Sequence, residues 1–246
     1  MALPDPQADG PWTLFLGADL PVAVTGLPSR ADLARALARR YGLDESLPLS
    51  EAAQRVSQAG NRFAFTALLR EALATGAPPR PFHARIVAAV QRLRIETILT
   101  TAYDDLLARA FQQAGIPCDR VVRGDDLAFL TPGRPTLIHL YGDIAQPDTL
   151  VVTDRDHLDL LRDRAREPLL DEVRRAFRRT SLLFLGYNLA DPDFRFLFDQ
   201  VAESRFARLA CLHVQSLQFL GKFPLPCGPL LEMRLDFPAG SVNRLL

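Results

Sequence analysis

Four short stretches, each placed where an apolar run ends, constrain the fold of this 246-residue chain most strongly. They are residues 15–19 (FLGAD), 100–104 (TTAYD), 139–143 (HLYGD) and 184–188 (FLGYN). Each apolar run stops at a glycine or at small polar residues. In an open α/β sheet, ligands bind at the carboxyl ends of the strands. The four stretches therefore predict one shared binding edge.

Strand-like and helix-like patterns alternate along the chain. The strands that we expect are residues 13–16, 96–100, 120–122, 136–140, 150–152, 182–185, 209–214 and 231–235. This alternation is typical of an α/β fold with a Rossmann-like, doubly wound and mostly parallel sheet. We expect the whole chain, residues 1–246, to form a single domain.

Only helical patterns occur between the first two expected strands. Segments at about 50–59, 62–75 and 82–93 predict an all-helical insertion over about residues 45–93. Before them, Ser29 followed by Asp32 predicts a helix start with a capping box. Asp191 and Pro192 predict another helix start.

The composition argues against several classes of partner. The chain has 29 Lys and Arg residues and 29 Asp and Glu residues, so no net field attracts it to nucleic acid or to a membrane surface. None of its three cysteines forms a Cys-x-x-Cys pair, which argues against a zinc site and fits a reducing compartment. The N-terminus lacks the pattern of a signal peptide, and no apolar run approaches the ~20 residues of a membrane span. We expect a cytoplasmic protein without a metal site.

The turn after the first strand has the position of a phosphate-binding turn. Gly17, Ala18 and Asp19 follow a strand and precede a loop and a helix, where a pyrophosphate would meet backbone amides. The glycine fingerprint of dinucleotide-binding folds is missing, so this turn alone does not distinguish a phosphate site from a structural turn.

The ordered set of motifs is more specific, and it resembles the bacterial sirtuin-like domain found in NAD-hydrolysing defence effectors. The matching segments are 17–19 (GAD), 26–29 (GLPS), 100–104 (TTAYD), 140–142 (LYG), 151–153 (VVT) and 184–193 (FLGYNLADPD). The resemblance covers about residues 12–236. Sirtuins with a zinc ribbon carry four cysteines that are missing here, which argues against protein deacylation.

The resemblance implies a Rossmann-like fold that binds NAD or an ADP-ribose derivative across the strand ends. It places the phosphates near residue 17, a ribose near residue 186 and the nicotinamide end near Asp104. The cofactor-binding positions that it implies are Gly17, Ala18, Asp19, Thr101, Ala102, Tyr103, Asp104, Gly142, Gly186, Tyr187 and Asn188.

The chain departs from the family at the reactive positions. The family's asparagine is Ala102 here, whose methyl group neither donates nor accepts a hydrogen bond. The family's catalytic histidine is Tyr141, and a phenol with an ordinary pKa near ~10 is a poor general base at pH 7. The second glycine of the family's first motif is Asp19, whose carboxylate would repel a pyrophosphate unless it is protonated or bridged by a cation.

Two neighbouring side chains could replace the lost groups. His139 lies two residues before Tyr141, so it shares a face of the strand, although a histidine there also packs well in a core. Asp143 is a spare carboxylate that either reaches the pocket or closes a turn. The candidate catalytic residues are therefore Tyr141, His139, Asp143 and Asp104.

Three interpretations of the function remain open. The first is a nucleotide-binding sensor or assembly module that hydrolyses its ligand slowly or not at all. The second is an active NAD glycohydrolase that uses His139, Tyr141 or Asp143. The third is a structural interaction module in which the Asp19 carboxylate fills the phosphate site. The expected partners are a nucleotide and a protein partner or larger assembly, which includes a second copy of the chain. Defence against phage is what the family implies.

Overall fold

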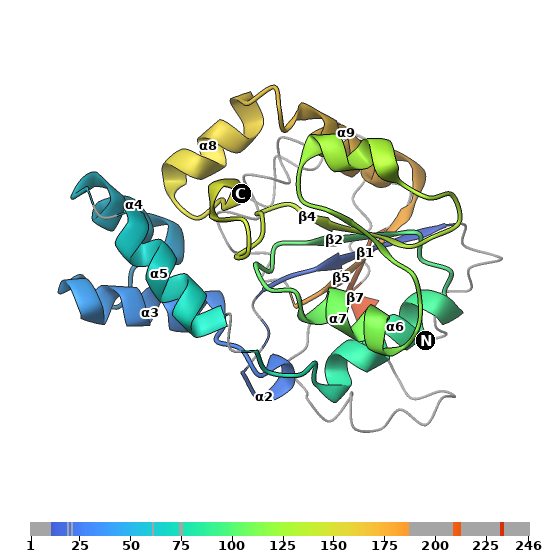
Figure 1. Ribbon diagram of the computed structural model, residues 1–246, viewed down its shortest axis with the longest axis horizontal. Coiled ribbons are helices and arrows are strands. Elements are labelled where there is room, and N and C mark those ends of the chain that lie inside the picture. The colour runs from blue at the N-terminus through green and yellow to red at the C-terminus, as the bar shows by residue number, and fades with distance from the viewer. Residues whose placement is uncertain are drawn as a thin grey trace.

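The computed structural model (Figure 1) describes residues 11–18, 20, 22–60, 62–73, 76–186, 209–212 and 232–233. Its described strands form one sheet in the order β3-β4-β2-β1-β5-β6-β7. They are β1 Trp12–Leu16, β2 Thr97–Thr100, β3 Asp119–Val121, β4 Thr136–His139, β5 Ser181–Leu185, β6 Leu209–Leu212 and β7 Glu232–Met233. All neighbouring pairs are parallel except β6 and β7, which are antiparallel. The prediction of a Rossmann-like α/β fold with a mostly parallel sheet is confirmed.

The central strands are mostly apolar because both faces of the sheet are covered. On one face, Phe15 of β1 stacks on Phe184 of β5 with ring centroids 5.1 Å apart. Helices α8 (Asp154–Arg162) and α9 (Glu167–Arg179) complete this side of the core. On the other face, Leu14 and Ile98 pack under α6 (Pro81–Arg92) and α7 (Leu106–Gln113).

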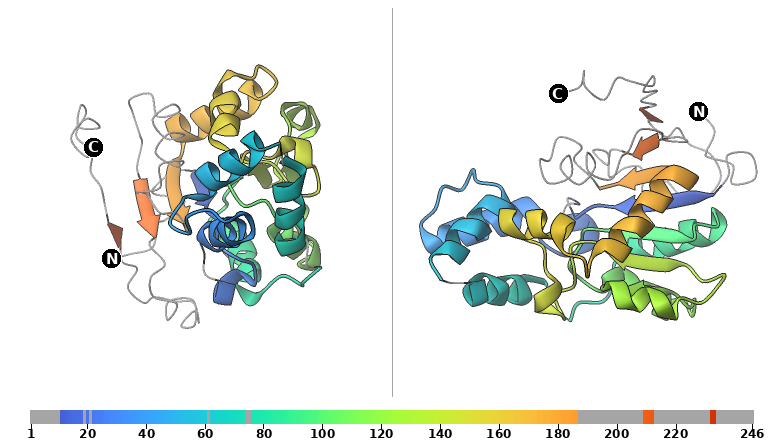
Figure 2. Two further views of the ribbon diagram at one scale, coloured as in Figure 1. Left: turned by 90° about the vertical axis from the view of Figure 1, so that its left-hand side faces the viewer. Right: turned by 90° about the horizontal axis from the view of Figure 1, so that it is seen from above.

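The predicted all-helical insertion after the first strand is also confirmed. Helices α4 (Leu49–Gln58), α5 (Arg62–Leu73) and α6 fall within the predicted range of about 45–93, and α2 (Val22–Thr25) and α3 (Arg30–Tyr41) precede it. Helices α3, α4 and α5 pack on one another and form a helical lobe at one side of the sheet (Figures 1 and 2). Helix α6 does not join this lobe. It lies against the sheet beside α7, with Phe82 and Ile86 in the core.

Local signals account for the start and end of α3. Ser29 and Asp32 form the predicted capping box: Asp32 N donates to Ser29 Oγ over 3.2 Å, and Ser29 N donates to Asp32 Oδ2 over 3.0 Å. The helix ends at Gly42, which adopts the left-handed conformation (φ 65°) that favours glycine.

The prediction of a strand at residues 150–152 is wrong. The segment is extended and buried, but its polar groups bond outside the sheet. Val151 N donates to Tyr141 O over 3.0 Å, and Val152 N donates to Asp156 Oδ2 over 3.1 Å. These bonds fix the segment between the turn after β4 and the start of α8. Short 3-10 helices at Gly124–Phe129 and Pro147–Thr149 complete the described elements.

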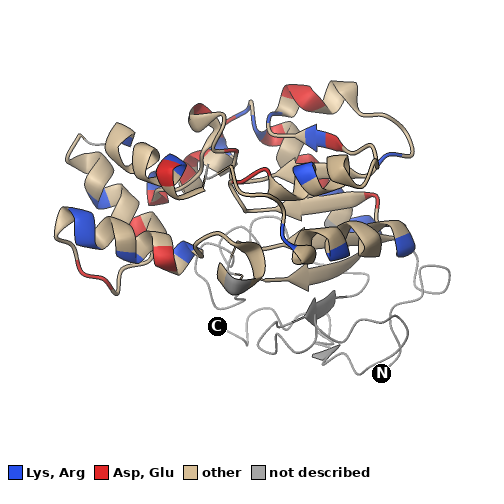
Figure 3. Ribbon diagram, turned by 60° about the horizontal axis from the view of Figure 1, so that its bottom comes forward, with Lys and Arg blue, Asp and Glu red and all other residues tan. Residues whose placement is uncertain are grey.

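Several other expectations concern residues outside the described part of the chain. These include the helix start at Asp191. On the described helices, acidic and basic residues are interspersed (Figure 3), as the balanced composition suggests. None of the helices in the described ranges has the length and apolar character needed to cross a bilayer.

Candidate functional site

The described parts of the four strand-end stretches lie side by side at one edge of the sheet. Backbone hydrogen bonds beyond the strand ladders link them. These are Gly17 N to Leu185 O at 2.8 Å, Thr101 N to Leu16 O at 3.3 Å, and Leu140 N to Thr100 O at 2.8 Å. The ends of β5, β1, β2 and β4 therefore form one continuous rim.

The direction in which successive strands are added to the sheet reverses at β1. The chain continues from β1 to β2 on one side, whereas β5 returns to the other side. Such a switch point opens a crevice at the carboxyl ends of the strands. Gly186 closes the β5 side with φ 72°, and an added Cβ would lie 2.6 Å from Leu20 Cγ. Glycine is therefore required at this place.

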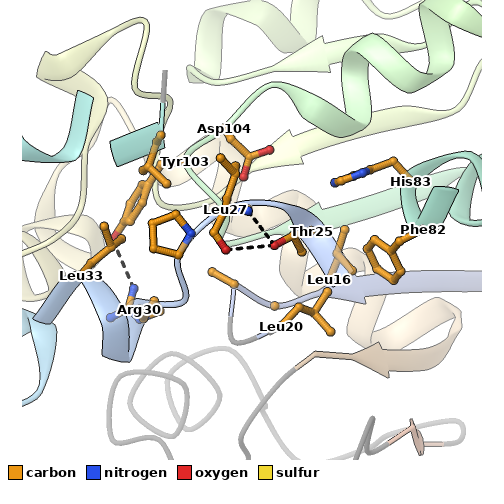
Figure 4. Close-up of a pocket in the computed structure, with 15 residues that line it drawn as sticks. Leu16, Leu20, Thr25, Leu27, Arg30, Leu33, Phe82, His83, Tyr103 and Asp104 are labelled. Carbon is orange, nitrogen blue, oxygen red and sulfur yellow. Dashed lines mark hydrogen bonds between the residues drawn. The ribbon is translucent and has the colours of Figure 1, made fainter. Parts of the chain in front are cut away.

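A cavity of about 50 Å³ opens beside this crevice (Figure 4). Its walls come from the end of β1, from α2, from the start of α3, from the end of α5, from α6 and from the loop after β2. The lining residues are Leu16, Gly17, Ala18, Leu20, Thr25, Leu27, Pro28, Arg30, Leu33, Leu73, Phe82, His83, Ala102, Tyr103 and Asp104.

The predicted cofactor positions fall into three groups. Five of them line the cavity: Gly17, Ala18, Ala102, Tyr103 and Asp104. Three lie on the rim outside its lining: Thr101, Gly142 and Gly186. Asp19, Tyr187 and Asn188 lie outside the described residues.

Ala102 occupies the cavity wall without a polar side chain. Its backbone is fixed, since Ala102 N donates to Thr100 Oγ1 over 3.1 Å and Ala102 O lies 3.2 Å from His139 Nδ1. Position 102 therefore contributes no polar side chain to the cavity wall. It offers no hydrogen bond to a water molecule or a ribose.

Tyr103 joins the cavity to the helical lobe. Its hydroxyl donates to Val151 O over 2.9 Å and accepts a hydrogen bond from Arg30 Nη1 over 3.1 Å. Arg30 is the first residue of α3, and only 7% of its surface is exposed. A buried guanidinium thus forms part of the cavity wall.

Asp104 places a carboxyl group in the cavity wall. Burial raises the pKa of this carboxyl, although the hydrogen bond from Leu106 N to Oδ1 over 3.0 Å opposes the change. The same hydrogen bond fixes the side chain at the start of α7. Asp104 is therefore a candidate for a group that holds or moves a proton.

His139 points into the interior rather than into the cavity. It is 1% exposed, and because a carbonyl oxygen only accepts, Nδ1 carries the proton that bonds Ala102 O. Among the described residues, Nε2 has no hydrogen-bond partner. Burial lowers the pKa of His139 to about 3, and the charge of Arg120 acts in the same direction. The imidazole is neutral at pH 7, and a group of such low basicity is a weak general base.

Tyr141 is also buried away from the cavity lining. Its ring packs edge-on against His157 with centroids 5.0 Å apart, and the Arg30 guanidinium carbon lies 5.5 Å from its centroid. Position 141 therefore lies behind the wall that contains Arg30.

Asp143 closes the turn after β4. Its Oδ1 accepts from Ala145 N over 2.7 Å, its backbone N donates to Thr149 Oγ1 over 3.0 Å, and its Oδ2 pairs with Arg120. The preceding Gly142 has φ 81°, and a Cβ there would lie 2.2 Å from Thr149 O. Both residues stabilise the turn, and neither lines the cavity.

Two titratable residues of the cavity wall, Arg30 and His83, were not predicted from the sequence. Arg30 directly follows the GLPS segment, and the arginine-rich composition was the available hint of anion recognition. His83 lies on α6 and is 4% exposed. It carries no local signal, since its position depends on how α6 packs against the sheet. Burial lowers the pKa of His83.

The fold and the site together define a Rossmann-like α/β domain with a crevice at the switch point of its sheet. Residues 96–213 match the family described as the SIR2-like domain, which agrees with the resemblance that the motifs carry. The chain is 26% identical over 194 residues to the NAD(+) hydrolase ThsA of Acinetobacter baumannii, covering 77% of this chain and 39% of that protein. It is 25% identical over 111 residues to the NAD(+) hydrolase ThsA of Cytobacillus dafuensis, covering 45% and 22% respectively.

The matched part of this chain thus spans less than half the length of each of these relatives. Both relatives are named as NAD(+) hydrolases.

Proposed function

We propose that this protein binds NAD or an ADP-ribose derivative at the strand-end crevice and hydrolyses it slowly or not at all. Binding would then act as a sensor or assembly signal in a bacterial, antiphage system. The observation that carries the proposal is the methyl group of Ala102 at the cavity wall, combined with the position of Tyr141 outside it. Neither of the two positions that are reactive in the family therefore contributes an acid or base group to this cavity.

Features of the cavity wall support the proposed binding of a nucleotide. Gly17 and Ala18 line the cavity at the end of β1, on the edge of the sheet where α/β folds bind nucleotides. Arg30 adds a permanent positive charge to the same wall. These features favour a ligand that carries a negatively charged group, such as the phosphates of a nucleotide.

The surroundings of His139 and Asp143 support the proposal that hydrolysis is slow or absent. His139 is neutral and buried, and Asp143 is paired with Arg120. Each positioned acid or base group contributes roughly 10²-fold or more to a rate. A site that lacks two such groups would turn over NAD far more slowly than a site that has them.

An active NAD glycohydrolase is the second candidate. The names of the relatives favour it, and so does the Asp104 carboxyl in the cavity wall, whose pKa is raised by burial. In that case Asp104, rather than Tyr141, His139 or Asp143, is the group we would expect to handle the proton.

Titration calorimetry with NAD and with ADP-ribose, followed by chromatography of the same samples for nicotinamide, tests the proposal. Binding without nicotinamide release supports it. Release that is lost in Asp104→Asn supports the glycohydrolase instead. If neither ligand binds, both nucleotide hypotheses fail and the structural module remains.

A matched pair of variants shows whether binding occurs at this cavity. Ala102→Leu extends an apolar side chain into the cavity and should abolish binding. Ala114→Leu makes the same change at the exposed end of α7 and should leave binding unchanged. Light scattering with and without NAD tests the proposed assembly role, including association with a second copy. A mass that does not respond to any bound nucleotide argues against that role.

A further inference from the structure

His83 reaches the cavity from α6, an element that contributes none of the strand-end motifs. Its imidazole points into the pocket on the same side as Asp104 (Figure 4). Phe82 and Leu16 form the apolar wall beside it. His83 is 4% exposed, so the surrounding walls enclose most of this polar ring.

The backbone fixes which nitrogen of His83 carries the proton. Arg80 N donates a hydrogen bond to His83 Nδ1 over 3.0 Å, so Nδ1 is the acceptor. Burial lowers the pKa of His83, so the ring is neutral at pH 7 and its single proton is on Nε2. Among the residues that the structure describes, no partner accepts this proton. The cavity is therefore lined by a fixed and uncharged N–H donor.

The chemistry around His83 restricts what Nε2–H can bind. Asp104 lies on the same side of the pocket, so a phosphate there would meet a carboxyl group instead of a counter-charge. The cation of the pocket, Arg30, lies on the other side (Figure 4). A neutral donor near a carboxyl suits an uncharged oxygen, which is either a hydroxyl or a carbonyl.

We propose that His83 is a ligand-binding residue whose Nε2–H donates a hydrogen bond to an uncharged oxygen of the bound nucleotide. This inference rests on the proposed nucleotide binding and names the group that orients the ligand there. The oxygen belongs to a ribose hydroxyl, which NAD and ADP-ribose share, or to the carboxamide, which only NAD carries.

Two substitutions separate the two nitrogens of the ring. His83→Asn keeps an acceptor close to the position of Nδ1 for Arg80 N and removes the Nε2 donor. His83→Gln places an amide donor close to the position of Nε2. We expect about a tenfold weaker NAD affinity for His83→Asn, as for one lost hydrogen bond in a buried site. We expect His83→Gln to recover most of the affinity.

The ligand series then identifies the oxygen. Equal losses for NAD and ADP-ribose in His83→Asn assign a ribose hydroxyl, and a loss for NAD alone assigns the carboxamide. Inorganic pyrophosphate, tested as a competitor, should bind both proteins equally. A loss of pyrophosphate affinity in His83→Asn would overturn the proposal, because His83 would then bind phosphate.

Two further results distinguish the failure of this inference from the failure of the proposed function. Wild-type protein that binds no nucleotide refutes the proposed function, and the inference with it. Wild-type binding that stays unchanged in a folded His83→Asn refutes the inference alone. If His83→Asn unfolds, nuclear magnetic resonance of the His83 imidazole in the wild-type protein decides. A ligand-dependent shift of Nε2–H supports the hydrogen bond, and an unchanged signal at saturation refutes it.

Discussion

Arg62 of α5 pairs with Asp156 of α8, with Arg62 Nη1 2.9 Å from Oδ1 and 3.2 Å from Oδ2 of the carboxylate. This ion pair joins the helical lobe to a helix that covers the sheet. The same carboxylate also accepts from Val152 N over 3.1 Å and from Thr153 N over 3.0 Å. One side chain thus attaches the lobe and caps α8.

The two partners of this ion pair should differ in their contribution to stability. Arg62→Ala removes a half-exposed partner, and we expect a loss of about 0.5 kcal/mol in the free energy of unfolding. Asp156→Ala also removes the capping bonds, and we expect a loss of about 1–2 kcal/mol. Urea unfolding of both variants measures the difference. Equal losses would show that the capping hydrogen bonds do not contribute to the free energy of unfolding.

Gly142 should tolerate no side chain. An alanine there would have to hold φ 81° and place its Cβ 2.2 Å from Thr149 O. We expect Gly142→Ala to lose at least about 3 kcal/mol, because backbone strain and a clash with backbone combine.

Gly133 is the matched control, since it also has φ 81° but no atom lies within 4 Å of the added Cβ. Gly133→Ala should lose only about 1 kcal/mol, from the backbone conformation alone. Thermal unfolding compares the two variants. Similar losses in both would contradict the clash at residue 142.

Stability should fall in acid partly because of His139. Its pKa is lowered from 6.5 to about 3, so between these pH values the unfolded chain binds a proton that the folded protein does not. The contribution of the neutral His139 imidazole to the free energy of unfolding is fully present above pH 6.5 and is lost as the pH falls toward 3. The folding equilibrium should weaken by up to about tenfold per pH unit in this window.

His139→Asn isolates this effect. The amide keeps a donor near Ala102 O and removes the titrating ring. The difference in unfolding free energy between the wild-type protein and this variant, measured by urea unfolding from pH 7 to pH 4, should slope with pH. A flat difference would mean that His139 titrates normally.

A polar side chain at residue 102 should increase any NAD cleavage. Ala102→Asn puts an amide into the cavity wall, where it can orient a water molecule or a ribose, and we expect roughly tenfold or more faster nicotinamide release. Tyr141→His alone should have no such effect, because residue 141 lies outside the cavity lining. Chromatographic assays of both variants test this contrast. A gain only in Tyr141→His would show that the reactive position is not at residue 102.

The sequence predicts the features that depend on local pattern. Apolar runs that end at glycine predict the strand ends, and the pair of Ser29 and Asp32 predicts the start of α3, because both signals act over a few residues. The place where α6 packs does not follow from local pattern. An apolar stripe that includes Phe82 and Ile86 fits the lobe and the sheet equally well, and only the packed structure decides.

The wrong strand prediction and the two missed cavity residues have the same physical cause. Residues 150–152 are as apolar as a strand, but turn and cap hydrogen bonds satisfy their backbone, so burial alone does not make a strand. Arg30 and His83 reach the cavity from helices, and their positions depend on contacts between elements that are distant in the sequence.

The composition of the cavity wall has a consequence for how such domains diversify. Of the described residues that line the cavity, only Ala102, Tyr103 and Asp104 fall within the family match at 96–213. The end of β1 and the helices of the insertion supply the others. Two proteins that match this family over the same segment could therefore select different small molecules, because most of the cavity wall lies before that segment in the chain.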